Sequence, residues 1–319
     1  MMLRIVSTAA ANFMNNTLIS VVGPTGIGKT KLAISLALHF KTEILSADSR
    51  QFYREMTIGT AVPSEDELQA ARHHFIQHKS IFDSYSVGDY EREAISFLDT
   101  FFKSNNTAIL VGGSGLYVDA VTKGLDNFPK IPSQIRKDLN DQLSTQGLQP
   151  LKNKLKQLDP DYYSQVDLEN SHRVIRALEI CLGTRKPYSS FLGKAKPNRG
   201  FKNIYIGLTA DRELIYEGIN QRVDTMIAQG QLAEAKQLHA HSNLNALQTV
   251  GYRELFAYFD GKCDLDFAVS EIKKNTRRFA KRQLTWYRKR EDVLWLAYDM
   301  DTEKSIHLIE TKLKSTLNA

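Results

Sequence analysis

The sequence predicts an α/β protein, with helices on both faces of a parallel sheet and an all-helical insertion within the core. Short runs rich in leucine and β-branched residues alternate with segments of helical periodicity. The runs are almost continuously apolar, as in strands that are buried on both faces. Six of the eight prolines fall between residues 129 and 197, where no run is typical of a strand. These observations indicate one core that is interrupted by one helical segment.

Five strands are predicted, at residues 18–22, 43–46, 108–111, 204–208 and 293–296. Helices are predicted between the early strands, at residues 31–40 and 91–102, because apolar residues recur there every three or four positions. The core is therefore expected to comprise residues 17–124 and 201–319.

The helical insertion is predicted at residues 125–200. Ser133 is expected to cap one of its helices, and Pro150 is expected in the first turn of another. Either Asn170 or Ser171 is expected to precede a third helix.

The helix that follows the fourth strand is predicted from an apolar stripe that consists of Ile215, Ile219, Val223 and Met226. It is expected to end near Gly230, since glycine commonly terminates helices. Arg222 lies on this helix. Its residue type leaves two interpretations open, an ordinary surface arginine or a clamp for a diphosphate.

Composition excludes several classes of protein. The 319 residues suffice for about two domains, and 42% apolar with 24% charged residues is typical of globular proteins rather than disordered ones. No run of about 18 apolar residues is present, so no membrane contact is expected. Cys181 and Cys263 give neither a disulfide framework nor a zinc set, which suits a cytoplasmic protein. Residues 1–16 are expected to form a disordered leader, in which Met14 is an alternative start.

Residues 23–30 match the phosphate-binding pattern G-x-x-x-x-G-K-[ST]. They follow an apolar strand and open a helix, where backbone N–H groups and the helix N-terminus surround a phosphate. Lys29 is expected to reach a terminal phosphate, and the Thr30 hydroxyl is expected to bind Mg²⁺. Phosphate or diphosphate binding is therefore predicted for Gly23, Pro24, Thr25, Gly26, Ile27, Gly28, Lys29 and Thr30.

The turn over residues 112–115, Gly-Gly-Ser-Gly, follows the third strand and contains no acidic residue. An ATPase normally has a metal-binding aspartate after this strand, so the turn argues against ATP hydrolysis. The glycines either let a backbone segment approach a ligand at this edge of the sheet or simply make a tight strand-to-helix turn.

Asp48 follows the second strand, so it is expected at the same edge of the sheet as the phosphate loop. An aspartate with an ordinary pKa of about 3.9 is ionised at neutral pH. Three roles remain open for it: a general base, a metal ligand, or the cap of a following helix.

Residues 273–290 contain nine lysines and arginines and no acidic residue, whereas the rest of the chain is slightly acidic. A long helix is predicted there, with Phe279, Gln283 and Trp286 near one face. Nine cations without counter-charges would repel one another, which favours contact with a nucleic acid. The alternative is a solvated helix face whose tryptophan belongs to the core.

In their order along the chain, these motifs resemble the tRNA dimethylallyltransferase family, also called tRNA isopentenyltransferases, in its bacterial type. Besides the phosphate loop, the matches are the segments 46–51 (Ser-Ala-Asp-Ser-Arg-Gln), 112–117 (Gly-Gly-Ser-Gly-Leu-Tyr), 173–179, 222–224, 251–254 and 276–288. Together they span about residues 17–297. Ser114 stands where the family usually has threonine, and the zinc finger of eukaryotic relatives is missing.

The resemblance implies a nucleotide-kinase-like core with a helical insertion that contacts tRNA. It also implies transfer of a dimethylallyl group from dimethylallyl diphosphate to the exocyclic amine of the adenosine 3′ of the anticodon. The tRNAs would be those that read codons beginning with U. By this resemblance Asp48 is the base, and Thr30 and Arg222 steady the diphosphate and Mg²⁺. A monomer is expected, because nothing in the sequence suggests an obligate assembly.

The resemblance also implies five tRNA-contacting segments, which are described by residue as follows. They consist of Asp48, Ser49, Arg50 and Gln51; Ser114; His172, Arg173, Val174, Ile175 and Arg176; Leu247, Gln248, Thr249, Val250, Gly251 and Tyr252; and Lys281, Arg282, Gln283, Leu284, Thr285, Trp286, Tyr287 and Arg288. Two other functions use the same phosphate loop, a small-molecule kinase that consumes ATP and an RNA-binding switch controlled by a nucleotide. A kinase offers no role for the basic segment.

Overall fold

The structure, a computed structural model, describes residues 16–193 and 198–318. The chain divides into two compact units: a core unit, up to Thr122 and from Arg199 onward, and a helical unit, Lys123–Asn198. The boundaries predicted from the sequence, after residues 124 and 200, each lie two residues further along the chain. The predicted leader and Met14 lie outside the described residues, but Asn16, which was assigned to the leader, is buried and donates a hydrogen bond to the carbonyl of Gly200.

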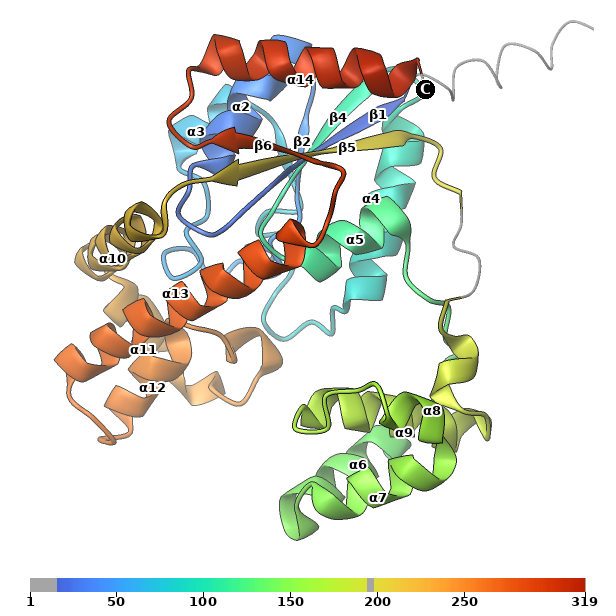
Figure 1. Ribbon diagram of the computed structural model, residues 1–319. Helices are drawn as coiled ribbons and strands as arrows, with labels where there is room; N and C mark the ends of the chain where they lie inside the picture. The colour runs from blue at the N-terminus through green and yellow to red at the C-terminus, as the bar shows by residue number, and fades with distance from the viewer. Residues whose placement is uncertain (1–15, 194–197, 319) are drawn as a thin grey trace, which may run out of the picture. The chain divides into compact units, whose positions relative to one another are not determined.

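The core unit contains a six-stranded parallel sheet with the order β3-β2-β4-β1-β5-β6 (Figure 1). The strands are β1 (Thr17–Val22), β2 (Ile44–Ser46), β3 (His73–His74), β4 (Thr107–Val111), β5 (Lys202–Thr209) and β6 (Val293–Ala297). The five predicted strands and the predicted fold class are confirmed. The sequence missed β3, because two residues are too few to show any periodicity.

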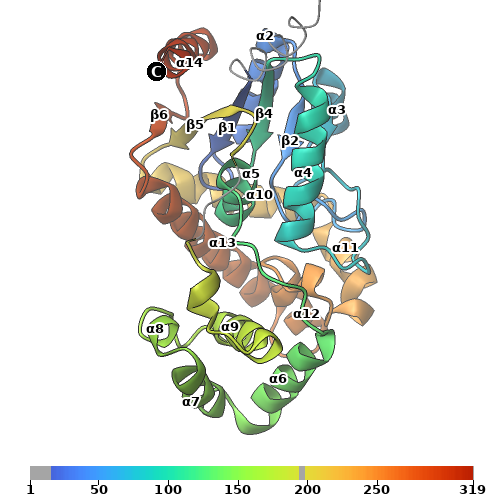
Figure 2. The same cartoon turned by 90° about the vertical axis from the view of Figure 1, so that its right-hand side faces the viewer.

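Side chains of β1 alternate between two hydrophobic clusters, one on each face of the sheet. Leu18 and Val22 pack with α4 (Val87–Phe101) and α5 (Gly115–Lys123). Ile19 and Val21 pack with α2 (Lys29–Phe40) and α14 (Thr302–Leu317), on the opposite face (Figures 1 and 2). Burial on both faces explains why the strands read as continuous apolar runs.

The described residues of the core unit contain further helices. They are α3 (Glu65–Ala70), α10 (Arg212–Ala228), α11 (Gln231–Leu238), α12 (Tyr252–Phe259) and α13 (Leu265–Arg288), with short 3-10 turns at His239–His241 and Asn245–Leu247. The apolar stripe of α10 is buried at Ile215, Ile219 and Val223 as predicted.

The helical unit contains α6 (Ser133–Gln146), α7 (Gln149–Leu158), α8 (Pro160–Tyr163), α9 (Ser171–Thr184) and a 3-10 turn at Tyr188–Phe191. Pro150 lies in the first turn of α7, and the Asn170 side chain accepts a hydrogen bond from the backbone of Arg173 at the start of α9. The expected cap at Ser133 is wrong. Pro132 occupies the cap position and Ser133 is already helical.

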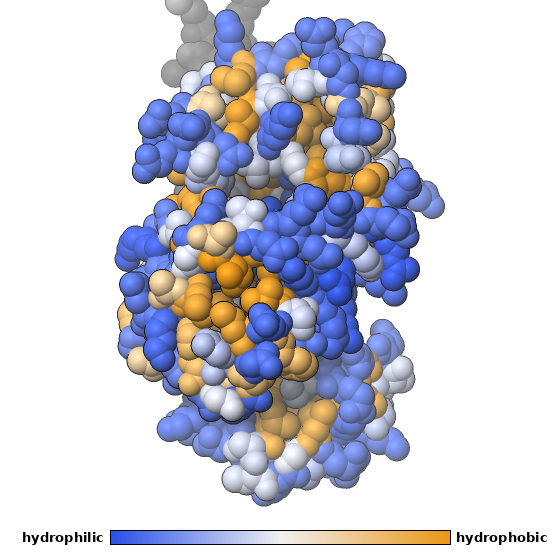
Figure 3. Space-filling view, turned by 90° about the vertical axis from the view of Figure 1, so that its left-hand side faces the viewer, coloured by the Kyte–Doolittle hydropathy of each residue, from blue (hydrophilic) through white to orange (hydrophobic). Residues whose placement is uncertain are grey.

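None of the helices in the described part of the chain combines the length and apolar character that a membrane span requires. The surface in Figure 3 is mostly hydrophilic, with hydrophobic side chains in several separate patches. Cys181 and Cys263 are both free thiols.

Candidate active site

The phosphate loop connects β1 to α2, as predicted. Gly23 has φ +141°, and a side chain there would meet the carbonyl oxygen of Leu208 in the neighbouring strand at 2.8 Å, so glycine is required. The Lys29 ammonium donates a hydrogen bond to the carbonyl of Pro24 at 2.7 Å. Thr30 lies in the first turn of α2, beside Lys29. The loop thus presents backbone N–H groups, an ammonium and a hydroxyl at a helix N-terminus.

Two adjoining cavities open at this edge of the sheet. A polar cavity of about 370 Å³ is lined by residues 25–31 of the phosphate loop and helix start, with Gln51 and Glu67. A second cavity, of about 390 Å³, has an apolar wall that includes Leu116, Ile219, Val223, Met226, Val250, Ile272 and Phe279. Four residues line both cavities: Thr25, Asp48, Gly113 and Arg222. The predicted base and the predicted clamp therefore lie where the polar and the apolar cavity meet.

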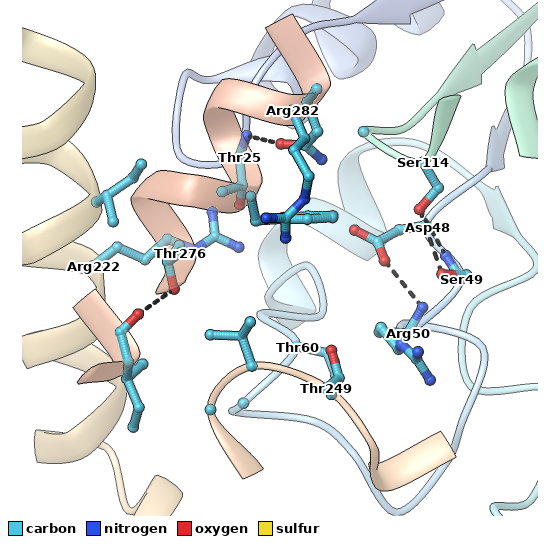
Figure 4. Close-up of a pocket in the computed structure, with 18 of the residues that line it drawn as sticks. Thr25, Asp48, Ser49, Arg50, Thr60, Ser114, Arg222, Thr249, Thr276 and Arg282 are labelled. Carbon is cyan, nitrogen blue, oxygen red and sulfur yellow. Dashed lines mark hydrogen bonds between the residues drawn. The ribbon is translucent and has the colours of Figure 1, made fainter. Parts of the chain in front are cut away.

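The Asp48 carboxylate points into the apolar cavity (Figure 4). One of its oxygens, Oδ1, accepts a hydrogen bond from the backbone N–H of Arg50 at 3.0 Å, which fixes the turn after β2. No helix follows Asp48, so the helix-cap interpretation is wrong. The second oxygen, Oδ2, remains for a ligand. This arrangement suits two of the roles left open for Asp48, a general base and a metal ligand.

Two cations face Asp48 across the site. Burial, and then the Arg222 guanidinium, lower the pKa of Lys29 to about 7. Asp48 acts in the opposite direction and favours the ammonium. Burial also lowers the pKa of Arg222, while Asp48 and Glu67 favour its charged form. Arg222 is partly buried between the cavities, so it is not an ordinary surface arginine. Lys29 and Arg222 thus share the polar cavity with the carboxylates of Asp48 and Glu67.

The basic helix α13 is attached to both glycine-rich loops through one side chain. Gln283 is buried, and its Oε1 accepts a hydrogen bond from the backbone N–H of Thr25 at 2.9 Å (Figure 4). A side chain at Gly113 would approach the Gln283 amide to 2.1 Å, so a larger residue there would displace that amide. The turn after β4 therefore allows close approach of a protein segment, as well as starting α5 at Gly115.

The expected lack of counter-charges along the basic segment is wrong in part. Lys273 pairs with Asp224 at 2.7 Å, and Arg290 pairs with Asp119. These carboxylates come from other helices, which no local pattern reveals. Fewer cations of residues 273–290 therefore lack a carboxylate partner than the composition suggested.

Three cations in the last turns of α13 are exposed, namely Lys281, Arg282 and Arg288. Trp286 lies among them with 41% of its surface exposed, and its indole N–H donates a hydrogen bond to Asp119 at 3.1 Å. Arg282 and Trp286 also line the apolar cavity. Charge and an aromatic surface thus adjoin the mouth of the site.

Most of the predicted tRNA-contacting residues fall into three overlapping groups in the structure. The cavities are lined by Asp48, Ser49, Arg50, Gln51, Ser114, Thr249, Val250, Gly251, Arg282, Gln283 and Trp286. Side chains packed in a core, and so shielded from a partner, are those of Val174, Ile175, Leu247, Tyr252 and Tyr287, and Gln283 is buried as well. His172, Arg173 and Arg176 lie on α9 of the helical unit, with the first two exposed.

Several cavity residues were missed by sequence reasoning. Gly59 and Thr60 follow Asp48 in a loop without a recognisable motif, and Thr276 and Phe279 lie on the cavity side of α13. The periodicity of α13 placed Phe279 on the same face as Gln283. Thr276 and Phe279 also fall within the matched segment 276–288, but neither was named as a site residue.

Comparisons with known proteins agree with this geometry. A family model described as IPP transferase matches residues 51–290. The chain is 58% identical to a tRNA dimethylallyltransferase of Christiangramia forsetii, covering 95% of this chain and all of the relative, and 56% identical to one of Flavobacterium johnsoniae, covering 94% and 99%. A crystal structure of a tRNA isopentenylpyrophosphate transferase from Bacillus halodurans is 36% identical, with a TM-score of 0.70 over 94% of this chain and 98% of that one.

A eukaryotic dimethylallyltransferase that acts on tRNA has a TM-score of 0.80 over 94% of this chain and 80% of that one. It is 24% identical and so supports the fold alone. The family model matches more than half of the chain, and the two bacterial relatives cover 95% and 94% of it. The protein therefore belongs to the IPP transferase family.

Proposed function

We propose that the protein transfers a dimethylallyl group from dimethylallyl diphosphate to the exocyclic N6 amine of an adenosine in tRNA, releasing diphosphate. The adenosine is the one immediately 3′ of the anticodon, in tRNAs that read codons beginning with U. One observation carries the proposal: Asp48 faces both an anion-binding loop and an apolar cavity. The relatives, which are named tRNA dimethylallyltransferases, support the same reaction.

The diphosphate is assigned to the phosphate loop. An allylic diphosphate ionises readily once its leaving group is stabilised, and preorganised positive charge provides that stabilisation. Lys29 and Arg222 line the polar cavity and supply the charge. A bound diphosphate favours the protonated form of Lys29, because an opposite charge offsets the effect of burial.

Mg²⁺ is proposed to accompany the diphosphate, with Thr30 as its ligand from the chain. Mg²⁺ commonly binds through one or two protein oxygens, substrate phosphates and water. No group of three His, Cys, Asp or Glu side chains suited to a metal is found in residues 16–193 and 198–318. The donors present therefore fit an ion held mainly by substrate oxygens. When bound, the ion neutralises charge on the departing diphosphate.

The dimethylallyl chain is assigned to the apolar cavity. Its five carbons carry no hydrogen-bonding group, so burial against aliphatic side chains is favourable by roughly 25 cal/mol per Å². Ile219, Val223 and Met226 of α10 and Ile272 of α13 supply such a surface. The same side chains keep water away from the allylic carbon, where hydrolysis would compete with transfer.

Asp48 is proposed as the group that accepts the amine proton. An adenine amine is a poor nucleophile, and its proton becomes acidic only as the new C–N bond forms, so an already ionised carboxylate suffices. The bond to the Arg50 backbone holds one carboxylate oxygen in place and leaves the other for the amine. The electron pair of the breaking C–O bond leaves with the diphosphate.

The tRNA is assigned to the surface around the cavity mouth. Lys281, Arg282 and Arg288 are exposed and can contact phosphates, while Trp286 offers a face for stacking. An adenosine in a loop leaves its stack at lower cost than one in a duplex, which suits an anticodon loop.

One assay tests the proposal against the kinase alternative. The protein is incubated with unmodified tRNA and labelled dimethylallyl diphosphate, and in parallel with γ-labelled ATP and candidate small molecules. We expect label in RNA from the diphosphate substrate only, and nuclease digestion should yield N6-dimethylallyladenosine. Transfer of the ATP label without RNA prenylation would reject the proposal.

A further inference from the structure

A carboxylate outside the predicted site holds one wall of the apolar cavity. Glu234 lies on α11, which carries no motif, and its side chain faces the loop that follows Asp48. Its Oε2 accepts hydrogen bonds from the backbone N–H groups of Thr57 and Ile58, each at 2.8 Å. Its Oε1 accepts from the backbone N–H of Gly59 at 2.9 Å. Three consecutive backbone donors thus converge on one carboxylate, an arrangement typical of an anion-binding turn.

The same carboxylate also holds α12. The Tyr252 hydroxyl donates a hydrogen bond to Glu234 Oε1 at 2.6 Å. The Tyr252 ring is fully buried and lies directly against Gly59, where any side chain would collide with it at 2.7 Å. Burial and then Glu234 raise the pKa of Tyr252, so its hydroxyl remains a donor at every working pH.

Both segments that Glu234 joins line the cavity. Gly59 and Thr60 belong to one, and residues 249–251, just before Tyr252, belong to the other. The first segment is also attached to the Asp48 turn, because the Gln51 side-chain amide donates to the carbonyl of Ala61 at 2.8 Å. Glu234 therefore connects, through protein hydrogen bonds alone, a wall of the cavity to the turn that carries the base.

We propose that Glu234 is a positioning residue for the RNA side of the reaction: it fixes the loop 57–60 and the turn 249–252 as one wall against which the target adenosine is placed. The inference rests on the proposed function, which assigns the base to this cavity. Within the apolar cavity, the prenyl chain is assigned to the side chains of α10 and Ile272, and the adenosine to the wall of residues 59–60 and 249–251 that Glu234 holds. None of the four hydrogen bonds of Glu234 described above reaches the phosphate loop.

The test compares Glu234→Gln with Glu217→Gln, which makes the same change at an exposed position of α10. The amide of Glu234→Gln keeps the shape of the side chain but places a donor against backbone donors, so about two of four bonds are lost. We expect kcat/KM for an anticodon stem-loop RNA to fall at least about tenfold in Glu234→Gln, while KM for dimethylallyl diphosphate changes less than about twofold. Glu217→Gln should match the wild-type protein in both.

A second variant separates positioning from folding. Tyr252→Phe removes one of the four bonds without changing the charge, so a smaller loss on the RNA side is expected, and its effect should not add fully to that of Glu234→Gln. An unchanged kcat/KM for RNA in Glu234→Gln would overturn the inference. An equal loss of kcat/KM for both substrates, together with a lowered melting temperature, would also overturn the inference. That pattern indicates a structural role only.

The outcome also distinguishes the inference from the proposed function. Absence of transfer by the wild-type protein would contradict the proposed function itself. Transfer by the wild-type protein with no selective loss in Glu234→Gln or Tyr252→Phe would contradict only the role of Glu234.

Discussion

Gln283 and Thr25, which are 258 positions apart in sequence, are joined by a 2.9 Å hydrogen bond from the Thr25 backbone N–H to the Gln283 side-chain oxygen. This bond attaches the basic helix α13 to the phosphate loop. The parts of the site that are proposed to face the RNA and the diphosphate therefore meet at one buried amide. Gly113 packs against the same amide, so three segments depend on it.

Replacing Gln283 with alanine should lower the free energy of unfolding by about 2 kcal/mol, because it leaves a backbone N–H unpaired and a small cavity behind. Urea unfolding measures the change. The matched control is Gln237→Ala on the exposed face of α11, which should change stability by less than about 0.5 kcal/mol. Equal stability of the two variants would contradict the role assigned to the bond.

Asp48→Asn should reduce the rate of prenyl transfer by about 100-fold or more, since an amide cannot accept the amine proton. The asparagine oxygen can still accept from the Arg50 backbone, so the turn and the affinity for tRNA should be retained. Single-turnover rates and tRNA binding measure the two quantities separately. Retained turnover would remove Asp48 from the chemistry.

The affinity for dimethylallyl diphosphate should depend on pH through Lys29. Its pKa is lowered to about 7, so above that pH the free protein loses the ammonium that the diphosphate requires, and binding must take up a proton. We expect the Kd of the wild-type protein for dimethylallyl diphosphate to rise by up to about tenfold per pH unit above 7. Lys29→Met should bind the diphosphate weakly and lack this pH dependence. Calorimetry in buffers of different ionisation enthalpy measures the proton uptake.

The same group predicts a stability trend. Between the folded-state pKa of about 7 and the ordinary value of 10.5, the unfolded chain binds one proton more than the folded protein. The free energy of unfolding should therefore gain a contribution that increases with pH across this range. Comparing wild type with Lys29→Met by denaturant unfolding isolates it, and an identical pH dependence of the two would contradict it.

Changing Lys281 and Arg282 to alanine should weaken tRNA binding and flatten its salt dependence, by up to about one unit of slope for each lost phosphate contact. Lys304 and Lys314, which are exposed on α14, form the matched control pair. Binding is measured across a series of salt concentrations. If both double variants keep the wild-type slope, the end of α13 faces away from the RNA.

Motifs with strict local geometry were predictable from sequence. The phosphate loop follows β1 and opens α2 as its pattern requires, and Asp48 follows β2 at the same edge of the sheet. Continuous apolar runs predicted five strands, because burial on both faces leaves that record in each strand. The sequence offered Asn170 or Ser171 as the residue that precedes α9, and Asn170 is its cap. Such a cap can be recognised because it acts within one turn.

Contacts between distant segments were not predictable. The counter-charges of Lys273 and Arg290 come from Asp224 and Asp119, and the wall of the cavity is held by Glu234 on a helix that carries no motif. Such partners depend on how helices pack, and a pairing across many residues leaves no periodic trace in the chain. Thr60 and Thr276 likewise line the cavity because of how distant segments pack.

By itself the sequence determined the α/β core, the phosphate loop, the position of Asp48 and the resemblance to a family, because each depends on residues close together in the chain. Only the tertiary structure decided that Asp48 caps no helix, that Arg222 lies between two cavities, and that Gln283 is buried against the loop instead of exposed on its helix. The physical reason is burial. Which side chains lose their contact with water is determined by packing among distant segments.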